Sequence, residues 1–198
     1  MLNTVSSGMK KFANKKFILP LLILLIVILV FMERGPFGSG KLRELSGGTG
    51  MLDMQFGYGA DQAYAMLGKI GGTGRQLYTK LLSLDFLFAL VYMVLQSLLI
   101  TALLKKANLN DRFTKLNLLP LVRSALDVAE NCLLLFLIIS FPVQHTAAVW
   151  ISSAITMMKL AINYGYMAIV FLLGALTTRK SIQPGPGRKN MKETEQVL

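Results

Sequence analysis

Four long apolar segments constrain the fold of this chain more than any other feature of its sequence. Each comes close to or exceeds the ~20 residues that an α-helix needs to cross ~30 Å of hydrocarbon. Hydrophobic residues make up 54% of the chain and charged residues only 16%, which is not the balance of a soluble domain. The sequence therefore predicts an all-α membrane protein with four transmembrane helices, at 17–33, 81–104, 117–140 and 147–176.

The first apolar segment has two interpretations. It is the shortest of the four and follows four lysines, as the apolar part of a secretory signal peptide would. However, the sequence that leaves it, MERGPFGSG, contains no small-x-small cleavage site. We therefore interpret 17–33 as an uncleaved membrane anchor.

Basic residues near the ends of the segments predict the orientation of the chain, because cytoplasmic connections carry an excess of Lys and Arg. Thirteen of the 21 Lys and Arg lie in the N-terminal stretch 1–16, the connection 105–116 and the tail 177–198, against six in the loop 34–80. We therefore expect a multi-pass protein of the cell membrane, whether inner or plasma membrane. Both termini should be cytoplasmic, and the loop 34–80 should lie on the other side.

The formal net charge of +11 would suggest a nucleic-acid partner in a soluble protein. In a membrane protein the same charge faces anionic lipid headgroups at the cytoplasmic surface, where each basic residue contributes about 1 kcal/mol. We therefore expect membrane lipids as partners and no nucleic acid. A second copy of the chain or another membrane protein remains a possible partner.

The outer loop holds twelve of the 17 glycines and divides into two parts. We expect the first part, up to about residue 55, to be flexible. In the second part, Asp61 can cap a short helix at about 61–70 whose apolar stripe would cover the outer end of the bundle. GGTG at 71–74 is expected to break that helix, and the polar tail 177–198 is expected to be disordered.

Three short sequence features are of kinds that occur in chemical sites. GPFGSGK at 35–41 has the spacing of a phosphate-binding loop, but Leu42 replaces the magnesium-binding hydroxyl and no buried strand precedes it, so a linker is the better interpretation. His145 is the only histidine and Cys132 the only cysteine, which excludes sites with several imidazoles and internal disulfides. We therefore predict no cofactor, no metal site and no catalytic residue, and we favour a protein without enzymatic activity.

The third apolar segment is unusual because it carries Arg123, Asp127, Glu130 and Asn131. Spacings of three and four residues place these side chains on one face of a helix. Three charges that faced lipid would oppose insertion by roughly 8–10 kcal/mol. The polar face is therefore predicted to point into the bundle.

Depth in the membrane predicts the partners of these side chains. Counting about 1.5 Å per residue from the predicted helix ends puts Asp127 ~15 Å and Lys159 ~12 Å from the cytoplasmic face. We therefore expect Arg123 to pair with Asp127, and Lys159 with Asp127 or Glu130. The predicted polar core consists of Asp85, Tyr92, Gln96, Arg123, Asp127, Glu130, Asn131, Lys159 and Asn163, with Arg75 or Lys80 available to balance Asp85.

In their order and spacing, several short motifs resemble a family of small bacterial four-helix membrane proteins with no known activity. The motifs are Phe-Gly-Tyr at 56–58, Gly-Arg-x-x-Tyr at 74–78, Asp85 followed by an aromatic residue and Tyr92, and Leu-Pro at 119–120 with Asp-x-x-Glu-Asn at 127–131. The resemblance covers residues 53–175 and implies a four-helix fold. It also implies that Arg75, Tyr78 and Asp85 cluster at the outer mouth of the bundle.

Two functions remain open at this point. The first is a non-enzymatic four-helix bundle whose polar core binds a small amphipathic ligand or lipid beneath the glycine-rich loop. The second is a proton- or ion-coupled transporter or channel component that uses Glu130 and Asp127, although no inverted repeat or pair of broken helices supports it. An intramembrane enzyme would use the same two residues as acid or base, but no nucleophile or cofactor motif accompanies them. We favour the first function.

Overall fold

The computed structural model describes residues 8–109 and 111–182, and these residues form helices and no strand. Within them, three segments are helical, long and apolar enough to cross a membrane: Lys15–Leu45, Gly71–Lys106 and Thr146–Thr178. The all-α prediction is confirmed. In chain order the elements are α2 (Lys15–Arg34), α3 (Ser39–Leu45), the 3-10 turn η1 (Leu52–Met54), α4 (Ala60–Lys69), α5 (Gly71–Lys106), η2 (Asp111–Leu118), α6 (Leu119–Ser140) and α7 (Thr146–Ile182).

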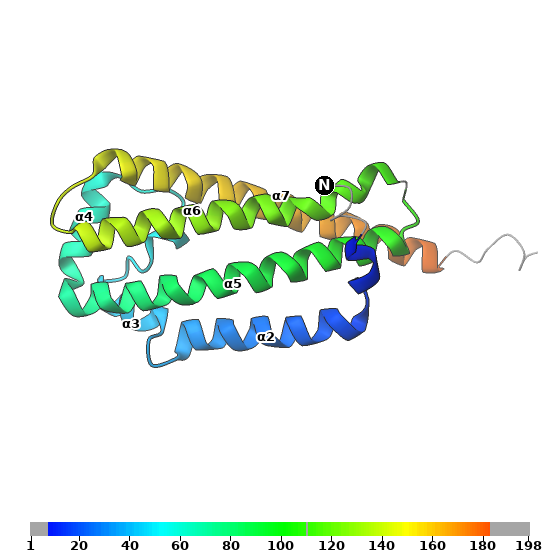
Figure 1. The fold of residues 1–198 in the computed structure, drawn as a ribbon, viewed down its shortest axis with the longest axis horizontal. Helices are drawn as coiled ribbons and strands as arrows, with labels where there is room; N and C mark the ends of the chain where they lie inside the picture. The colour runs from blue at the N-terminus through cyan, green and yellow to red at the C-terminus, as the bar shows by residue number, and fades with distance from the viewer. Residues whose placement is uncertain (1–7, 110, 183–198) are drawn as a thin grey trace, which may run out of the picture.

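The four long helices lie side by side along the molecule, while α3, α4 and the outer loop close one end (Figure 1). The central helix is α5, which packs against α2, α6 and α7, whereas α2 packs mainly on α5 and α3. Half of the apolar stretch of α5 is buried, against 11% for the segment containing α2 and 17% for α7. Therefore α5 forms the core of the bundle, and α2 and α7 leave most of their apolar surface exposed.

The contact between α2 and α5 is a narrow apolar seam. On α2 only Leu25 and Ile28 are buried, and they pack with Val91 and Leu95 of α5. A spacing of three or four residues keeps each pair on one side of its helix. The rest of α2 is therefore free to border cavities on its flanks.

The first part of the outer loop is folded, which corrects the prediction of a flexible segment. It contains α3 and η1, and Leu42 and Leu52 are fully buried in an apolar cluster with side chains of α4, α5 and α6. GPFGSGK forms the turn between α2 and α3 and the start of α3. Burial of these leucines removes apolar area from water, and this gain holds the segment in place.

The short helix α4 lies within one residue of its predicted position, and the apolar stripe predicted there, Ala63, Met66, Leu67 and Ile70, is buried. Its N-cap is Gly59 and no side chain caps it, so the predicted cap by Asp61 is wrong. The break before α5 falls at Gly71, whose φ of +65° is a left-handed conformation that glycine adopts without strain. All four residues of GGTG lie in the first turn of α5, which begins at Gly71.

Two of the long helices extend beyond their predicted ends. Because α5 begins at Gly71, residues 71–80 belong to this helix and not to the loop. Because α7 continues to Ile182, residues 177–182 are helical, which corrects the predicted start of the disordered tail. The remainder of that tail, 183–198, lies outside the described residues.

Candidate functional site

An ionic network joins α6 to α7 at the centre of the bundle. Lys159 of α7 pairs with both Asp127 and Glu130 of α6, and Arg123 Nη1 lies 3.2 Å from Asp127 Oδ2. Both carboxylates are at most 2% exposed, and Thr156 donates a hydrogen bond to Glu130. The predicted ion pairs are therefore confirmed. Residues spaced three and four apart lie on one face of α6, and this face contacts α7 at the height of Lys159.

A second polar contact joins α5 to α6. Asn131 Nδ2 donates a hydrogen bond of 2.7 Å to Asp85 Oδ2, and both residues are buried. The expectation that Arg75 or Lys80 balances Asp85 is wrong. The Arg75 guanidinium lies over the Phe141 ring at 4.3 Å and the Lys80 ammonium over the Phe37 ring at 4.2 Å.

Aromatic side chains of α5 border the ionic network. Phe88 and Tyr92 stack with ring centroids 5.2 Å apart, and the Arg123 guanidinium lies 4.6 Å from the Tyr92 ring centre. The Tyr92 hydroxyl donates a hydrogen bond of 3.0 Å to Asn163 Oδ1. Gln96 is also buried, but its Nε2 has no hydrogen-bond partner among the described residues.

The side chains at the outer end of the site do not form the cluster predicted for the mouth of the bundle. The Tyr78 hydroxyl donates a hydrogen bond of 2.8 Å to Asp53 Oδ1 and accepts one of 2.9 Å from the Leu52 N–H. Arg75 instead donates a hydrogen bond of 2.9 Å to the Leu67 carbonyl. The residues predicted to cluster there, Arg75, Tyr78 and Asp85, therefore have separate partners, although all three lie on α5.

Asp53 is a site residue that the sequence analysis missed, because it lies in the segment predicted to be flexible. It is 8% exposed, and burial raises its pKa, while the nearby Lys159 charge and the Tyr78 hydrogen bond act in the opposite direction. One sequence signal was available: an acidic residue between apolar neighbours in MLDM, within a glycine-rich loop.

Tyr58 was also missed, although it lies in the quoted Phe-Gly-Tyr motif. Its N–H donates to Ser153 Oγ at 2.9 Å, and its hydroxyl donates to Ser152 Oγ at 2.8 Å. Burial raises the pKa of Tyr58 to about 12. These bonds attach the outer loop to α7 next to the ionic network.

A cavity of about 570 Å³ lies beneath the outer loop and between α2, α5, α6 and α7, within the size range of small-molecule sites. Its apolar wall includes Leu25, Leu29 and Met32 of α2, and its polar wall includes Asp53. From the predicted polar core the cavity wall contains Asp85, Tyr92, Arg123, Asp127, Lys159 and Asn163, whereas Gln96, Glu130 and Asn131 are not part of it.

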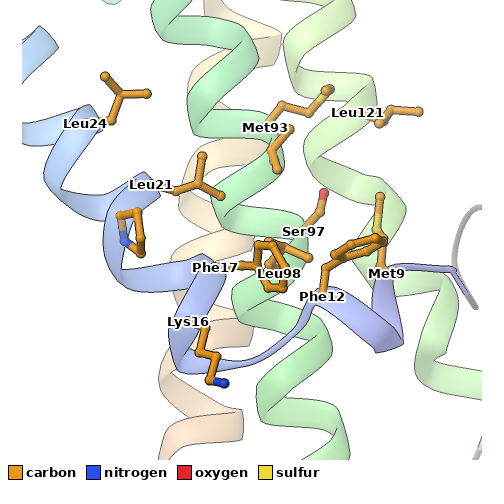
Figure 2. A pocket seen from close by; sticks show the side chains of 12 residues that line it. Met9, Phe12, Lys16, Phe17, Leu21, Leu24, Met93, Ser97, Leu98 and Leu121 are labelled. Carbon is orange, nitrogen blue, oxygen red and sulfur yellow. The ribbon is translucent and has the colours of Figure 1, made fainter.

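A second cavity, of about 430 Å³, lies beside the N-terminal half of α2 and is shown in Figure 2. Its wall is apolar except for Lys16 and Ser97, and it contains none of the ionic residues of α6 and α7. The larger cavity is therefore the candidate site, because it combines an apolar wall with charged groups.

Among the described residues, no group of three or more His, Cys, Asp or Glu side chains is arranged to hold a metal ion. No protein-family model matches the chain, and neither a curated protein nor a solved structure is detectably similar to it. The resemblance to small four-helix membrane proteins therefore stays a prediction, and any proposal for function must depend on the geometry of the cavity.

Proposed function

We propose that this chain is a four-span integral membrane protein that binds a small amphipathic molecule or a lipid in the larger cavity, without changing it chemically. The observation that carries this proposal is the composition of the cavity wall. Leucine and methionine side chains of α2 form one part of the wall and buried charged side chains of α5, α6 and α7 form another. An amphipathic molecule has the same division into a tail and a polar headgroup.

The fourth span in this proposal is α6, which is long enough to cross but carries Arg123, Asp127 and Glu130. The ion pairs with Lys159 and within α6 support this assignment, because paired charges inside a bundle do not face lipid. The outward side of α6 exposes apolar side chains such as Val122, Phe136 and Ile139. We place the outer loop outside the cell and both termini in the cytoplasm of a cell-membrane protein, following the distribution of basic residues.

The position of α2 supports entry of the ligand from the side. This helix is held mainly by its seam on α5, and the cavity wall includes its C-terminal half. A tail lying along Leu25 and Leu29 would remain at the apolar edge of the bundle while its headgroup reaches Arg123 or Asp85. Access through the outer loop is less direct, because Tyr78 and Tyr58 bind that loop to α5 and α7.

A pair of substitutions on α2 tests the proposal. Leu29 lines the larger cavity and Leu24 the smaller one, and their exposed fractions are similar at 46% and 43%. We expect Leu29→Trp to fill the larger cavity and to remove co-purified lipid or bound amphiphile detected by native mass spectrometry. Leu24→Trp is the control and should leave that bound species in place. Equal retention in both variants would contradict the proposal.

The shared ammonium of Lys159 supports a second candidate function, proton- or ion-coupled transport. One cation between two buried carboxylates forms a cluster in which a proton or ion can exchange. On this hypothesis Glu130→Gln abolishes proton-dependent flux in proteoliposomes while the variant remains folded. Flux that is unchanged in the variant would remove Glu130 from such a role.

A further inference from the structure

Two buried carboxylates in the wall of the larger cavity, Asp53 and Asp85, have no cationic partner; Glu33, another carboxylate of the wall, is exposed and accepts a hydrogen bond from the Ser39 hydroxyl. Asp53 accepts a hydrogen bond from the Tyr78 hydroxyl and Asp85 accepts one from the Asn131 amide, and both donors are neutral. None of the ion pairs between described residues includes either carboxylate. Both side chains belong to residues at most 8% exposed, so water solvates them only through the cavity.

The nearby cations are already committed to other acids. The Lys159 ammonium is shared by Asp127 and Glu130, and Arg123 pairs with Asp127. Arg75 and Lys80, the next basic side chains along α5, lie over aromatic rings of other segments. If all carboxyl groups are ionised, Asp53 and Asp85 therefore leave the site with an excess of negative charge, and burial makes such an excess costly.

Building on the proposed amphiphile-binding function, we propose that the headgroup bound in this cavity is an ammonium cation, held between Asp53 and Asp85. A monovalent ammonium group offsets one of the two unpaired negative charges, and it binds carboxylates without a metal coordination shell. The stacked rings of Phe88 and Tyr92 also belong to the cavity wall, and aromatic rings stabilise ammonium groups by cation–π attraction. The apolar side chains of α2 accept the attached tail.

Binding of matched decyl probes tests the charge of the headgroup. The protein is kept in micelles of an uncharged maltoside detergent, and protein-free micelles give the partition background. Radiolabelled decyltrimethylammonium, decanol and decanoate share one tail and differ in charge. We expect the cationic probe to bind at least about tenfold more tightly than decanol, which corresponds to about 1.4 kcal/mol, and decanoate to bind weakest.

Substitutions identify the site of that binding. We expect Asp85→Asn and Asp53→Asn each to weaken decyltrimethylammonium binding about tenfold and to leave decanol binding within about twofold. Asp61→Asn is the matched control, since Asp61 is an exposed carboxylate of α4. Equal binding of the cationic and neutral probes, or tighter binding of decanoate, would overturn the ammonium headgroup even if Leu29→Trp still displaces an amphiphile. If Leu29→Trp displaces nothing, the proposed function itself fails.

A fourth probe distinguishes two sources of the same headgroup chemistry. Decylphosphocholine carries the quaternary ammonium behind a phosphate, as a phospholipid does. If it binds at least as tightly as decyltrimethylammonium, the ammonium belongs to a phospholipid headgroup. If it binds more weakly, the ligand is an amphipathic amine. Both results are consistent with an ammonium headgroup, provided that Asp85→Asn still weakens binding of the probe.

Discussion

At the scale of single residues, Lys159 determines whether the polar core is stable. Its ammonium is the shared partner of Asp127 and Glu130, whose side chains are at most 2% exposed. A buried ion pair adds little stability beyond what apolar side chains of similar volume would give. Loss of one partner, however, leaves a buried charge without compensation. Removal of Lys159 is therefore expected to cost more than removal of either acid.

Lys159→Met should lower the free energy of unfolding by about 3–5 kcal/mol, because it leaves the buried Glu130 without a cation and Asp127 with Arg123 alone. The measurement is denaturant unfolding in uncharged detergent micelles. Lys41→Met, at an exposed position of α3, is the control and should have little effect. In a double-mutant cycle Asp127→Asn and Lys159→Met should be non-additive by about 0.5–3 kcal/mol, and additive effects would mean that the pair does not interact.

Asp53 should give the protein a distinct pH dependence. Burial raises its pKa above the ordinary value of 3.8, so the folded state holds the proton more tightly than the unfolded state does. The contribution of Asp53 to stability therefore falls as pH rises from that ordinary value through the folded pKa. The melting temperature of the parent chain minus that of Asp53→Asn should increase on acidification over this range. A difference that is constant, or that decreases on acidification, would contradict the raised pKa.

At the scale of elements, the outer loop is a packed part of the bundle. The 3-10 turn η1 is held by the Tyr78 hydroxyl, and Tyr58 joins the following segment to α7. These bonds place Asp53 in the cavity wall. The loop therefore contributes to the site itself, beyond connecting two helices.

Tyr78→Phe should detach η1 while retaining the aromatic ring in the core. It removes one hydrogen bond to Asp53 and one from the Leu52 N–H, for a cost of about 1–3 kcal/mol. Hydrogen–deuterium exchange should show faster amide exchange around Leu52 than in the parent chain. Tyr164→Phe, at a 62% exposed tyrosine of α7, is the control and should leave that exchange unchanged. Unchanged exchange in Tyr78→Phe would mean that apolar packing alone fixes the turn.

At the scale of the whole molecule, the outer loop lies at one end of the bundle and the C-terminal part of α7 extends to the other (Figure 1). This arrangement supports the proposal that α2, α5, α6 and α7 each cross the membrane and that the basic connections lie on one side. The larger cavity borders α2, which packs mainly on α5, and in the proposed function a membrane amphiphile enters from this edge of the bundle.

Cysteine labelling should separate the two ends. In a Cys132→Ser background, Met54→Cys introduces a thiol at a 76% exposed position of the outer loop, and Thr178→Cys introduces one near the end of α7. A membrane-impermeant maleimide added to intact cells should label position 54 at once and position 178 only after permeabilisation. Labelling of both positions in intact cells would rule out the four-span orientation.

The sequence alone predicted the helical class and much of the ionic network. Runs of apolar residues long enough to span a membrane specify helices, because their backbone groups bond within the same segment. The contacts of Lys159 with Asp127 and Glu130 followed from helical spacing and from counting residues along two antiparallel segments. Both predictions depend on local sequence, because the rise per residue of a helix is constant and so fixes the depth of each side chain along it.

Only the tertiary structure decided which side chains the cavity brings together. Asp53 reaches the site because Tyr78, 25 residues further along the chain, binds it, and no local period encodes that contact. Arg75 and Lys80 lie over the rings of Phe141 and Phe37 instead of pairing with Asp85. Both rings belong to turns between helices, and tertiary packing brings them next to the two cations. The sequence therefore determined the helices and the depth of the charged side chains along them. The packing of the outer loop and of α2 on α5 determined which carboxylates remain without a cation, since such contacts depend on residues far apart in the chain.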